Sequence, residues 1–506
     1  MLALVDDEVE RLQTMLNNLK IKRRYLCKFS KVHTTILSPF RRFPPEILTD
    51  IFHHVVSDYV VDPNVTRGIW LLGRVCSYWR SVLLSSPSLW SNFQIDAVYP
   101  SQNSPIAVAE LLSRSGTSPL SFKLNIPHGA HLDIDKLLSV VRILTTASRR
   151  WCTVHLGFVR QPLLPILGNM LGRVPMLTDL TYRGDSTPPI WLMGAPSLRK
   201  VNIRFLVSLK SGGSYLSPTS YLPCSQLRMC YVNFLTLRQE LDLLRCSPNL
   251  TDYTLVCERS TEHIQLSPPD MICMPKLHTL HLASWDNPLV LDNLVLCSLD
   301  EIRFVRTCGC MEVASSLVEL LSRSRSFPTR LDLYDDTIWL VTRIPFQNLT
   351  TFHLTCETVE LFGTVVPALT IKPEDSSVML PKLEHLHIHP LCDESMAYQG
   401  DASLVIEMVC SRWHLTEDRL STTTRLASFK FIPDVASDSP SEFRGVLAPL
   451  LVLGDEGLEI EIDSFYTDKG EDDDEEEGDD DDDDDDDEDD EEGDDVEEGD
   501  DDDDDE

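Results

Sequence analysis

The chain has 506 residues, of which 42% are apolar, and a formal net charge of −37 at pH 7. One hydrophobic core rarely organises more than about 300 residues, so this length excludes a single small domain and predicts at least two structural units. The acidity is local, because residues 471–506 hold 32 of the 81 Asp and Glu, and the other 49 face 44 Lys and Arg. A body so nearly balanced in charge gives no reason to expect direct binding of nucleic acid.

The 14 cysteines are scattered and form no CxxC pair, which favours reduced thiols and a cytoplasmic or nuclear location. The chain begins MLALVDDEVERL, where no basic segment precedes an apolar one, so we expect no secretory signal. The longest apolar runs fall far short of the roughly 20 residues of a membrane span. We therefore expect a soluble protein without a membrane partner.

The first predicted element is a helix over residues 5–26, with acidic side chains near its start and basic ones toward its end. Its apolar positions alternate in steps of four and three, broken only by Arg23, and are Val5, Val9, Leu12, Leu16, Leu19 and Leu26. This charge order suits the helix dipole, and the apolar stripe requires a partner surface. Three heptads leave open whether that partner is a second copy or the next domain of the same chain.

Short helices are expected between residues 36 and 95. The first begins at Phe43-Pro44-Pro45-Glu46, because proline and an early carboxylate suit a helix start, and its apolar positions are Ile47, Leu48, Ile51, Phe52 and Val55. Residues 57–68 read as a loop. A second helix holds Trp70, Leu71, Val75, Cys76 and Trp79, and a third apolar group closes with Pro87, Leu89 and Trp90.

From about residue 118 onward one pattern, P-x-L-x-x-L-x-L, recurs, mostly at intervals of 20 to 30 residues. Its copies are PMLTDLTY at 175, PSLRKVNI at 196, SQLRMCYV at 225, PNLTDYTL at 248, PKLHTLHL at 275, CSLDEIRF at 297, QNLTTFHL at 347, PKLEHLHI at 381 and TTRLASFKF at 423. This period is typical of leucine-rich repeats, in which one short strand per unit lines a curved solenoid. We expect Leu277, Leu280 and Leu282 to be buried. We also expect covering helices over 237–250 and 313–324, and a strand around Leu331 and Leu333 after the second helix.

The segment 36–95 resembles an F-box. The residues that carry the resemblance are FPPEIL…IF at 43–52, VCSYWR at 75–80 and Leu89-Trp90. Together with the preceding helix and the irregular repeats, it makes the chain similar to F-box proteins of mushroom-forming basidiomycete fungi. Two departures are Phe43, which replaces the usual leucine before the first proline, and the long loop 57–68.

The resemblance implies a three-helix unit that docks on the Skp adaptor, and through it on the cullin, of a Skp-cullin-F-box ubiquitin ligase. The chain is then a non-catalytic receptor whose repeats bind an unknown protein substrate. By position, the residues implied to meet the adaptor are Phe43, Pro44, Pro45, Ile47, Leu48, Ile51 and Phe52. The residues implied to complete the bound surface or its supporting core are Val75, Cys76, Trp79 and Trp90.

Common phosphate-binding, zinc-protease and hydrolase motifs are missing, so we expect no catalytic residue and no cofactor. Cys308 and Cys310 lack the second pair of ligands that a metal site needs, and we interpret them as structural thiols. The run EHLHIHP at 384–390 is the strongest candidate for recognition, because side chains alternate along a strand. We predict a substrate face, in preference to a zinc site, that comprises His281, His353, His385, His387 and His389.

The acidic run Glu471–Glu506 is expected to be disordered, because its like charges repel and it has no apolar surface to bury. We interpret it as a solubilising segment; the alternatives are a binding site for basic proteins such as histones, or an internal mimic of nucleic acid. The competing function is a scaffold or chaperone for basic nuclear proteins, with the F-box-like unit as an architectural cap. In total the sequence predicts an α+β protein with an N-terminal helix (1–35), an F-box (36–95), an irregular leucine-rich-repeat α/β solenoid (96–466) and a disordered acidic tail (467–506).

Overall fold

A computed structural model gives the arrangement of most of the chain as mixed helices and strands built around one long parallel sheet. The residues it describes are 2–37, 43–57, 69–98, 104–127, 133–184, 188–205, 216–256, 271–283, 289–305, 311–334, 340, 344, 346–357, 365–372, 378–391, 402–432 and 447–462. The predicted acidic tail, Cys308, Cys310 and the predicted loop 57–68 lie outside these ranges, except for Ser57, which is the last residue of a helix.

The described α-helices are α1 Leu2–Leu37, α2 Pro45–Ser57, α3 Ile69–Val75, α4 Ser77–Ser85, α5 Pro105–Arg114, α6 Ile134–Thr146, α7 Leu164–Gly168, α8 Leu237–Cys246, α9 Leu289–Asp292, α10 Met311–Ser324, α13 Val366–Leu369, α14 Ala402–Trp413, α15 Glu417–Leu420 and α17 Ala448–Asp455. Short 3-10 helices are η2 Pro87–Trp90, η3 Ser148–Arg150, η4 Ile190–Gly194, η5 Pro218–Ser220 and η6 Cys224–Gln226.

The strands are β1 Asn92–Asp96, β2 Leu120–Asn125, β3 Trp151–Val159, β4 Asp179–Gly184, β5 Lys200–Phe205, β6 Met229–Val232, β7 Asp252–Val256, β8 Ile272–Cys273, β9 Thr279–Ala283, β10 Leu294–Val295, β11 Glu301–Val305, β12 Arg330–Tyr334, β13 Thr351–Glu357, β14 His385–Leu391, β15 Ser428–Phe431 and β16 Glu459–Ile462.

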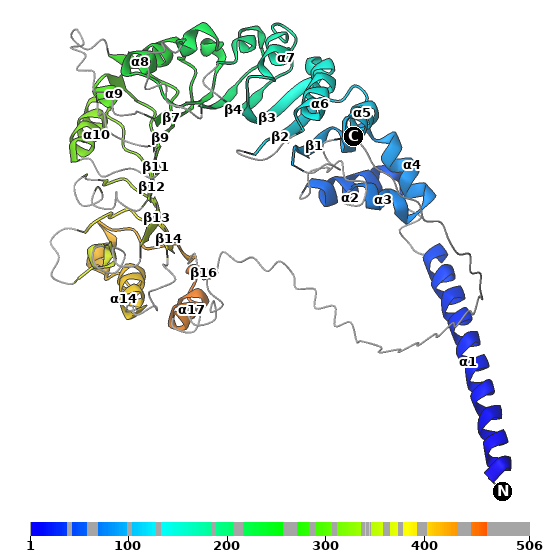
Figure 1. The fold of residues 1–506 in the computed structure, drawn as a ribbon. Helices are drawn as coiled ribbons and strands as arrows, with labels where there is room; N and C mark the ends of the chain where they lie inside the picture. Colours follow the sequence, from blue (N-terminus) through cyan, green and yellow to red (C-terminus); the bar gives the residue numbers. More distant parts are fainter. Residues whose placement is uncertain are drawn as a thin grey trace, which may run out of the picture.

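Within the described residues, 14 strands form one sheet that follows the order of the sequence, and every neighbouring pair is parallel. Only β8 and β10 are set apart, in a two-stranded sheet. The large sheet bends into an arc with helices α5 to α10 on its convex side, which leaves the concave side without a helical layer (Figure 1). Each strand with its covering segment therefore packs on the unit before it.

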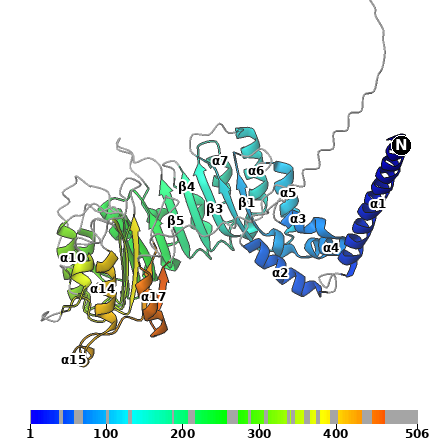
Figure 2. The ribbon, with the colours of Figure 1, turned by 90° about the horizontal axis from the view of Figure 1, so that it is seen from below.

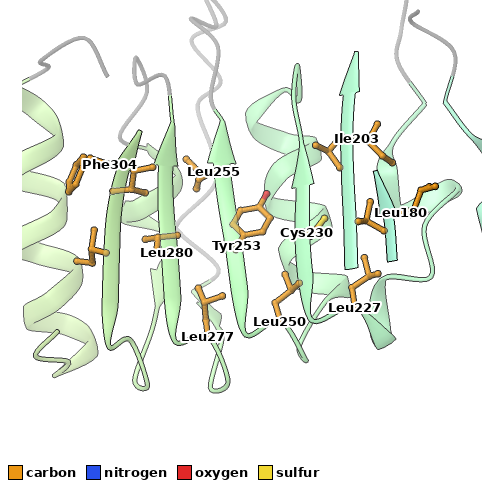
Figure 3. Packing of buried hydrophobic residues seen from close by; sticks show 14 of the residues in the cluster. Leu180, Ile203, Leu227, Cys230, Leu250, Tyr253, Leu255, Leu277, Leu280 and Phe304 are labelled. Carbon is orange, nitrogen blue, oxygen red and sulfur yellow. The ribbon is translucent and has the colours of Figure 1, made fainter. Parts of the chain in front are cut away.

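Alternate side chains of each strand fill the space between the sheet and the covering helices, as Figure 3 shows for Leu180, Ile203 and Tyr253. Leu277, Leu280 and Leu282 are each 0% exposed, as predicted. The opposite side chains of the same strands face the concave side. This alternation follows from the two-residue period of a strand and explains why each repeat keeps apolar residues two positions apart.

All nine copies of the repeated motif end in a strand of the large sheet, and the strand expected around Leu331 and Leu333 is β12. The two predicted covering helices are α8 and α10, although α8 ends at Cys246 because Ser247-Pro248 begins the next repeat. Strands β1, β2, β3, β12 and β16 of the large sheet carry none of these copies. The sheet begins at Asn92, so it starts inside the segment predicted as 36–95.

The helical unit, which we define as α2, α3, α4 and η2, covers the first strand of the sheet. Trp70 and Trp90 meet edge to face with ring centroids 4.9 Å apart, and the Arg114 guanidinium of α5 lies 4.5 Å from both rings. Phe93 of β1 then stacks on Phe122 of β2 at 5.6 Å. One buried cluster runs without a break from the helical unit to the last strand, so the unit caps this end of the core.

The prediction of one helix through Val75, Cys76 and Trp79 is wrong, because the chain divides it into α3 and α4. Cys76 is extended, with φ −160° and ψ 167°, and its Sγ accepts a hydrogen bond from the Trp79 backbone N–H at 3.4 Å. A short polar side chain in this position caps a new helix. The break turns α4 relative to α3, and both helices contact α2.

Helix α1 extends well beyond the predicted 5–26 and projects away from the rest of the protein (Figure 1, Figure 2). Val5 and residues 8–30 are all exposed, so this stretch does not pack back on the helical unit. No helix in the described ranges is both long enough and apolar enough to cross a membrane.

Candidate functional site

The first candidate surface is the outward side of the helical unit. On α2 the side chains of Leu48 and Phe52 are fully buried, whereas Ile47 is 47% and Val55 46% exposed, with Ile51 half-buried between them. Ile47, Ile51 and Val55 recur every four residues and so form a stripe along one side of the helix. The helix therefore buries one apolar row and presents a second to solvent.

Hydrogen bonds and ring contacts within the helical unit support this outward row. The Tyr78 hydroxyl of α4 donates a hydrogen bond to the Phe43 carbonyl oxygen at 2.7 Å, which fixes the start of α2. Phe52 meets Trp79 edge to face with centroids 5.1 Å apart. The Trp90 indole N–H donates to the Leu83 carbonyl at 2.8 Å, so the largest buried ring has its polar atom satisfied.

The residues predicted to meet an adaptor divide into three groups by burial. Those exposed to solvent are Pro44, Pro45, Ile47 and Val75; those half-buried are Phe43, Ile51, Cys76 and Trp79; those buried are Leu48, Phe52 and Trp90. A contact by Leu48 or Phe52 is excluded in this conformation because each is 0% exposed. These two, with Trp90, support the surface from beneath, and only the other predicted residues are accessible on it.

The second candidate surface is the concave face of the sheet. Strand pairing aligns one residue from each of the 14 strands in a continuous row, which we call the central rung. Its members are Gln94, Lys123, His155, Thr181, Asn202, Tyr231, Thr254, His281, Arg303, Asp332, His353, His387, Lys430 and Glu461. None is fully buried and all are polar, so the row presents hydrogen-bonding groups along the whole arc.

Two hollows along this face are lined by described residues. The first has a volume of about 620 Å³ and is lined from β3 to β9, by side chains that include His155, Asp179, Lys200, Arg204, Tyr231, Asp252 and His281. In it the Arg204 guanidinium lies 4.9 Å from the Tyr231 ring centroid and donates to the Asn202 side-chain oxygen at 3.3 Å. Burial raises the pKa of the Asp179 carboxyl above its usual range, although Lys200 opposes the shift.

The second hollow, of about 350 Å³, is lined from β11 to β16 by side chains that include Glu301, Arg303, Arg330, Asp332, His353, His385, His387, Lys430 and Glu459. The rings of His353 and His387 stack with centroids 4.2 Å apart and planes tilted by 20°. His385 Nδ1 lies 2.8 Å from the Ser428 hydroxyl, and Lys430 forms an ion pair with Glu461.

Burial favours the neutral form of the stacked histidines. Burial, followed by the charges of His353 and Lys430, lowers the pKa of His387 to about 4, and burial lowers the pKa values of His281, His353 and His389 as well. A neutral imidazole offers one donor and one acceptor, so this row can bind either kind of polar group without carrying charge.

The predicted histidine face is only partly a cluster. His281, His353 and His387 share the central rung, as expected, and His385 lies one step along its strand beside His387. His281, however, lines the first hollow, and strands β11 and β12 lie between it and His353, so the histidines line two separate hollows.

The charges lining the two hollows balance. The first combines Lys200 and Arg204 with Asp179 and Asp252, and the second combines three cations with three carboxylates. Nucleic acid requires a surplus of cations, so this face suits a polypeptide that offers both signs and uncharged polar groups.

Neither metal binding nor thiol chemistry finds support among the described residues. No group of three or more His, Cys, Asp or Glu is placed to hold a metal ion there. Burial raises the pKa of the Cys224 thiol to about 11 and raises that of Cys230 further, which disfavours the reactive thiolate.

Sequence reasoning missed the first hollow. A usable signal existed, since the residue between the last two apolar positions of each motif copy is the central-rung residue: Asn202 in KVNI, Tyr231 in MCYV, Lys430 in SFKF. The prediction used this rule only for histidine.

No family model matches the chain, and no curated protein matches it significantly.

Proposed function

We propose that this protein is the substrate-recognition subunit of a Skp-cullin-F-box ubiquitin ligase, with the helical unit as the F-box and the sheet as an irregular leucine-rich-repeat receptor. The observation that carries the proposal is the outward apolar row of α2, Ile47, Ile51 and Val55, which exists in addition to the row that builds the core. A cap that served only the sheet would need the inner row alone.

The apolar character of the outer row fits an adaptor interface. Protein interfaces place apolar anchor residues at a water-excluded centre. Replacing such an anchor by a charged residue sharply lowers the affinity of the complex. Leu71 and Val75 on α3 are 47% and 59% exposed, which extends the apolar surface of the same unit. The hydrogen bonds and ring contacts beneath the row hold it in one conformation, which lowers the conformational entropy lost on binding.

The concave face fits the role of target recognition because its chemistry differs from that of the helical unit. It is polar and balanced in charge along the whole arc. Since the helical unit stands at one end of the arc and the concave face runs along the strands that follow, an adaptor on the helical unit leaves most of the concave face open for a second protein (Figure 1). A receptor requires this separation.

The test is the affinity of the purified full chain for purified Skp adaptor, measured by calorimetry. We expect Ile47→Asp to weaken binding by at least about tenfold, since an interface carboxylate loses its water. The matched control is Ile106→Asp on α5, where the isoleucine is 82% exposed and lies on another element. Equal affinity of both variants, or no adaptor binding by the unaltered chain, would refute the proposal.

A second measurement separates the receptor from the scaffold for basic nuclear proteins. Deleting residues 471–506 should leave adaptor affinity unchanged. A Tyr231→Ala, His387→Asp variant should keep the adaptor but change which proteins are ubiquitinated in the reconstituted complex. Loss of every partner on deletion of the tail would instead favour the scaffold.

A further inference from the structure

Helix α1 presents an apolar stripe that nothing in the described structure covers. Val5, Val9, Leu12, Leu16 and Leu19 are each 47–60% exposed. A helix this long gains most of its stability from tertiary packing of its apolar side, and here that side faces solvent. The steps of four and three between these residues are the heptad pattern of a helix that pairs with another helix.

The charge distribution of α1 decides how two copies can pair. Glu8 and Glu10 lie near its start, and Lys20, Lys22, Arg23 and Arg24 follow one after another in its second half. A parallel pair brings like ends together and sets Arg23 against itself at a core position of the stripe. An antiparallel pair sets the acidic start of each helix beside the basic half of the other.

An antiparallel register centred on Thr14 satisfies both the stripe and the charges. It places residue i opposite residue 28 − i, so Leu12 meets Leu16 of the second copy and Val9 meets Leu19. Glu8 and Lys22 each directly precede a stripe position, so they flank the stripe on the same side and approach each other across the pair. Glu8 also accepts hydrogen bonds from Arg11 at 2.8 and 3.0 Å within its own helix, which orients its carboxylate.

We propose that α1 is a self-association helix that pairs with α1 of a second copy of this chain, antiparallel and centred on Thr14. The inference does not depend on the proposed function. It assigns the exposed stripe one occupant, a second α1, whose charges complement those of the first. Val9 and Leu12 meet apolar residues of the second copy, and Val5 lies opposite its Arg23.

The length of α1 allows this pairing without a clash. The paired stretch 5–23 spans about 27 Å, and the remaining 14 residues to Leu37 hold each helical unit about 21 Å beyond it. The two copies then extend in opposite directions from the paired helices. Such a dimer carries its two helical units and its two concave faces far apart, so both copies remain free to bind.

Light scattering and sedimentation of the full chain over a range of concentrations give the first test. We expect a monomer–dimer equilibrium, and Leu16→Asp should leave only monomer while far-UV circular dichroism shows the sheet intact. A protein that stays monomeric at every concentration, or a Leu16→Asp variant that still dimerises, overturns the proposal.

Charge reversal tests the antiparallel register. Lys22→Glu should weaken the dimer by about tenfold, because each dimer holds two Glu8–Lys22 contacts and both become repulsive. Glu8→Lys should do the same, and the combined Glu8→Lys, Lys22→Glu variant should recover the original dissociation constant to within about threefold. Lys28→Glu makes the same reversal on the side of the helix opposite the stripe and should have little effect.

In a parallel pair Glu8 and Lys22 lie about 21 Å apart along the axis, so the combined variant cannot restore binding there. The register is wrong if both single reversals weaken the dimer and the combined variant does not restore it. It is also wrong if none of the three variants changes the dissociation constant.

Discussion

Replacing Glu240 by glutamine should make the stability of the protein less dependent on pH. Glu240 lies on α8, is 0% exposed, and accepts a hydrogen bond at 2.6 Å from the Tyr253 hydroxyl of β7. Its other carboxyl oxygen has no hydrogen-bond partner among the residues that the structure describes. Burial raises the pKa of this carboxyl from 4.5 to about 8, although the Tyr253 bond opposes the shift. The folded protein therefore holds a proton that the unfolded chain releases.

The sign and size of the effect follow from this difference. Below pH 4.5 both states are protonated and the site costs nothing; as the pH rises toward 8 the unfolded chain ionises first, so stability falls. The slope is about 1.4 kcal/mol per pH unit, which makes the cost at pH 7 about 3 kcal/mol. Glutamine has the same shape and cannot ionise, so Glu240→Gln removes this dependence.

The assay is urea unfolding of both proteins side by side from pH 5 to pH 8, so that contributions of all other groups cancel. The stability of Glu240→Gln relative to the unaltered protein should rise steadily across this range. Glu319→Gln changes an exposed carboxylate on α10 and serves as the control, with a difference that stays constant. A constant difference for Glu240→Gln as well would refute the reasoning.

Three further predictions concern the rest of the fold. Gly194→Ala should destabilise the protein by about 2 kcal/mol in urea unfolding, because the added Cβ overlaps the backbone of a neighbouring turn, whereas Gly168→Ala meets nothing within 4 Å and should not destabilise it. Arg412→Met should cost about 3 kcal/mol or more by the same measurement, since the buried guanidinium donates to three carbonyl oxygens that methionine leaves unsatisfied. Lys430→Gln should raise the pKa of His387 from about 4 in an NMR titration, and an unchanged midpoint would contradict the contribution of Lys430.

The residues of the central rung can vary without disturbing the core of the proposed receptor. Every central-rung residue except Glu461 lies between two buried neighbours of its own strand, as His387 does between Leu386 and Ile388. Exchanging the rung residue alters the surface without altering the core. A solenoid of this kind can therefore change its target while it keeps its fold.

Particular residues show how far sequence reasoning reached. Leu277, Leu280 and Leu282 were predictable as core because a strand buries alternate positions whatever its surroundings. Ile47 and Leu48, by contrast, are adjacent, equally apolar and both implied as contacts by the resemblance. One is half-exposed and the other fully buried, and only the packing of α2 on its neighbours distinguishes them.

The sequence by itself determined the parallel repeat units, the long N-terminal helix and the local start of α2, because spacing, charge order and proline act within a few residues. Tertiary structure alone decided which side chains of that face come into contact: His353 and His387 stack although 33 residues separate them, and His281 lines another hollow. It also decided the break at Cys76 and the protonated state of Glu240. These features depend on register, burial and desolvation, which arise only when distant segments pack together.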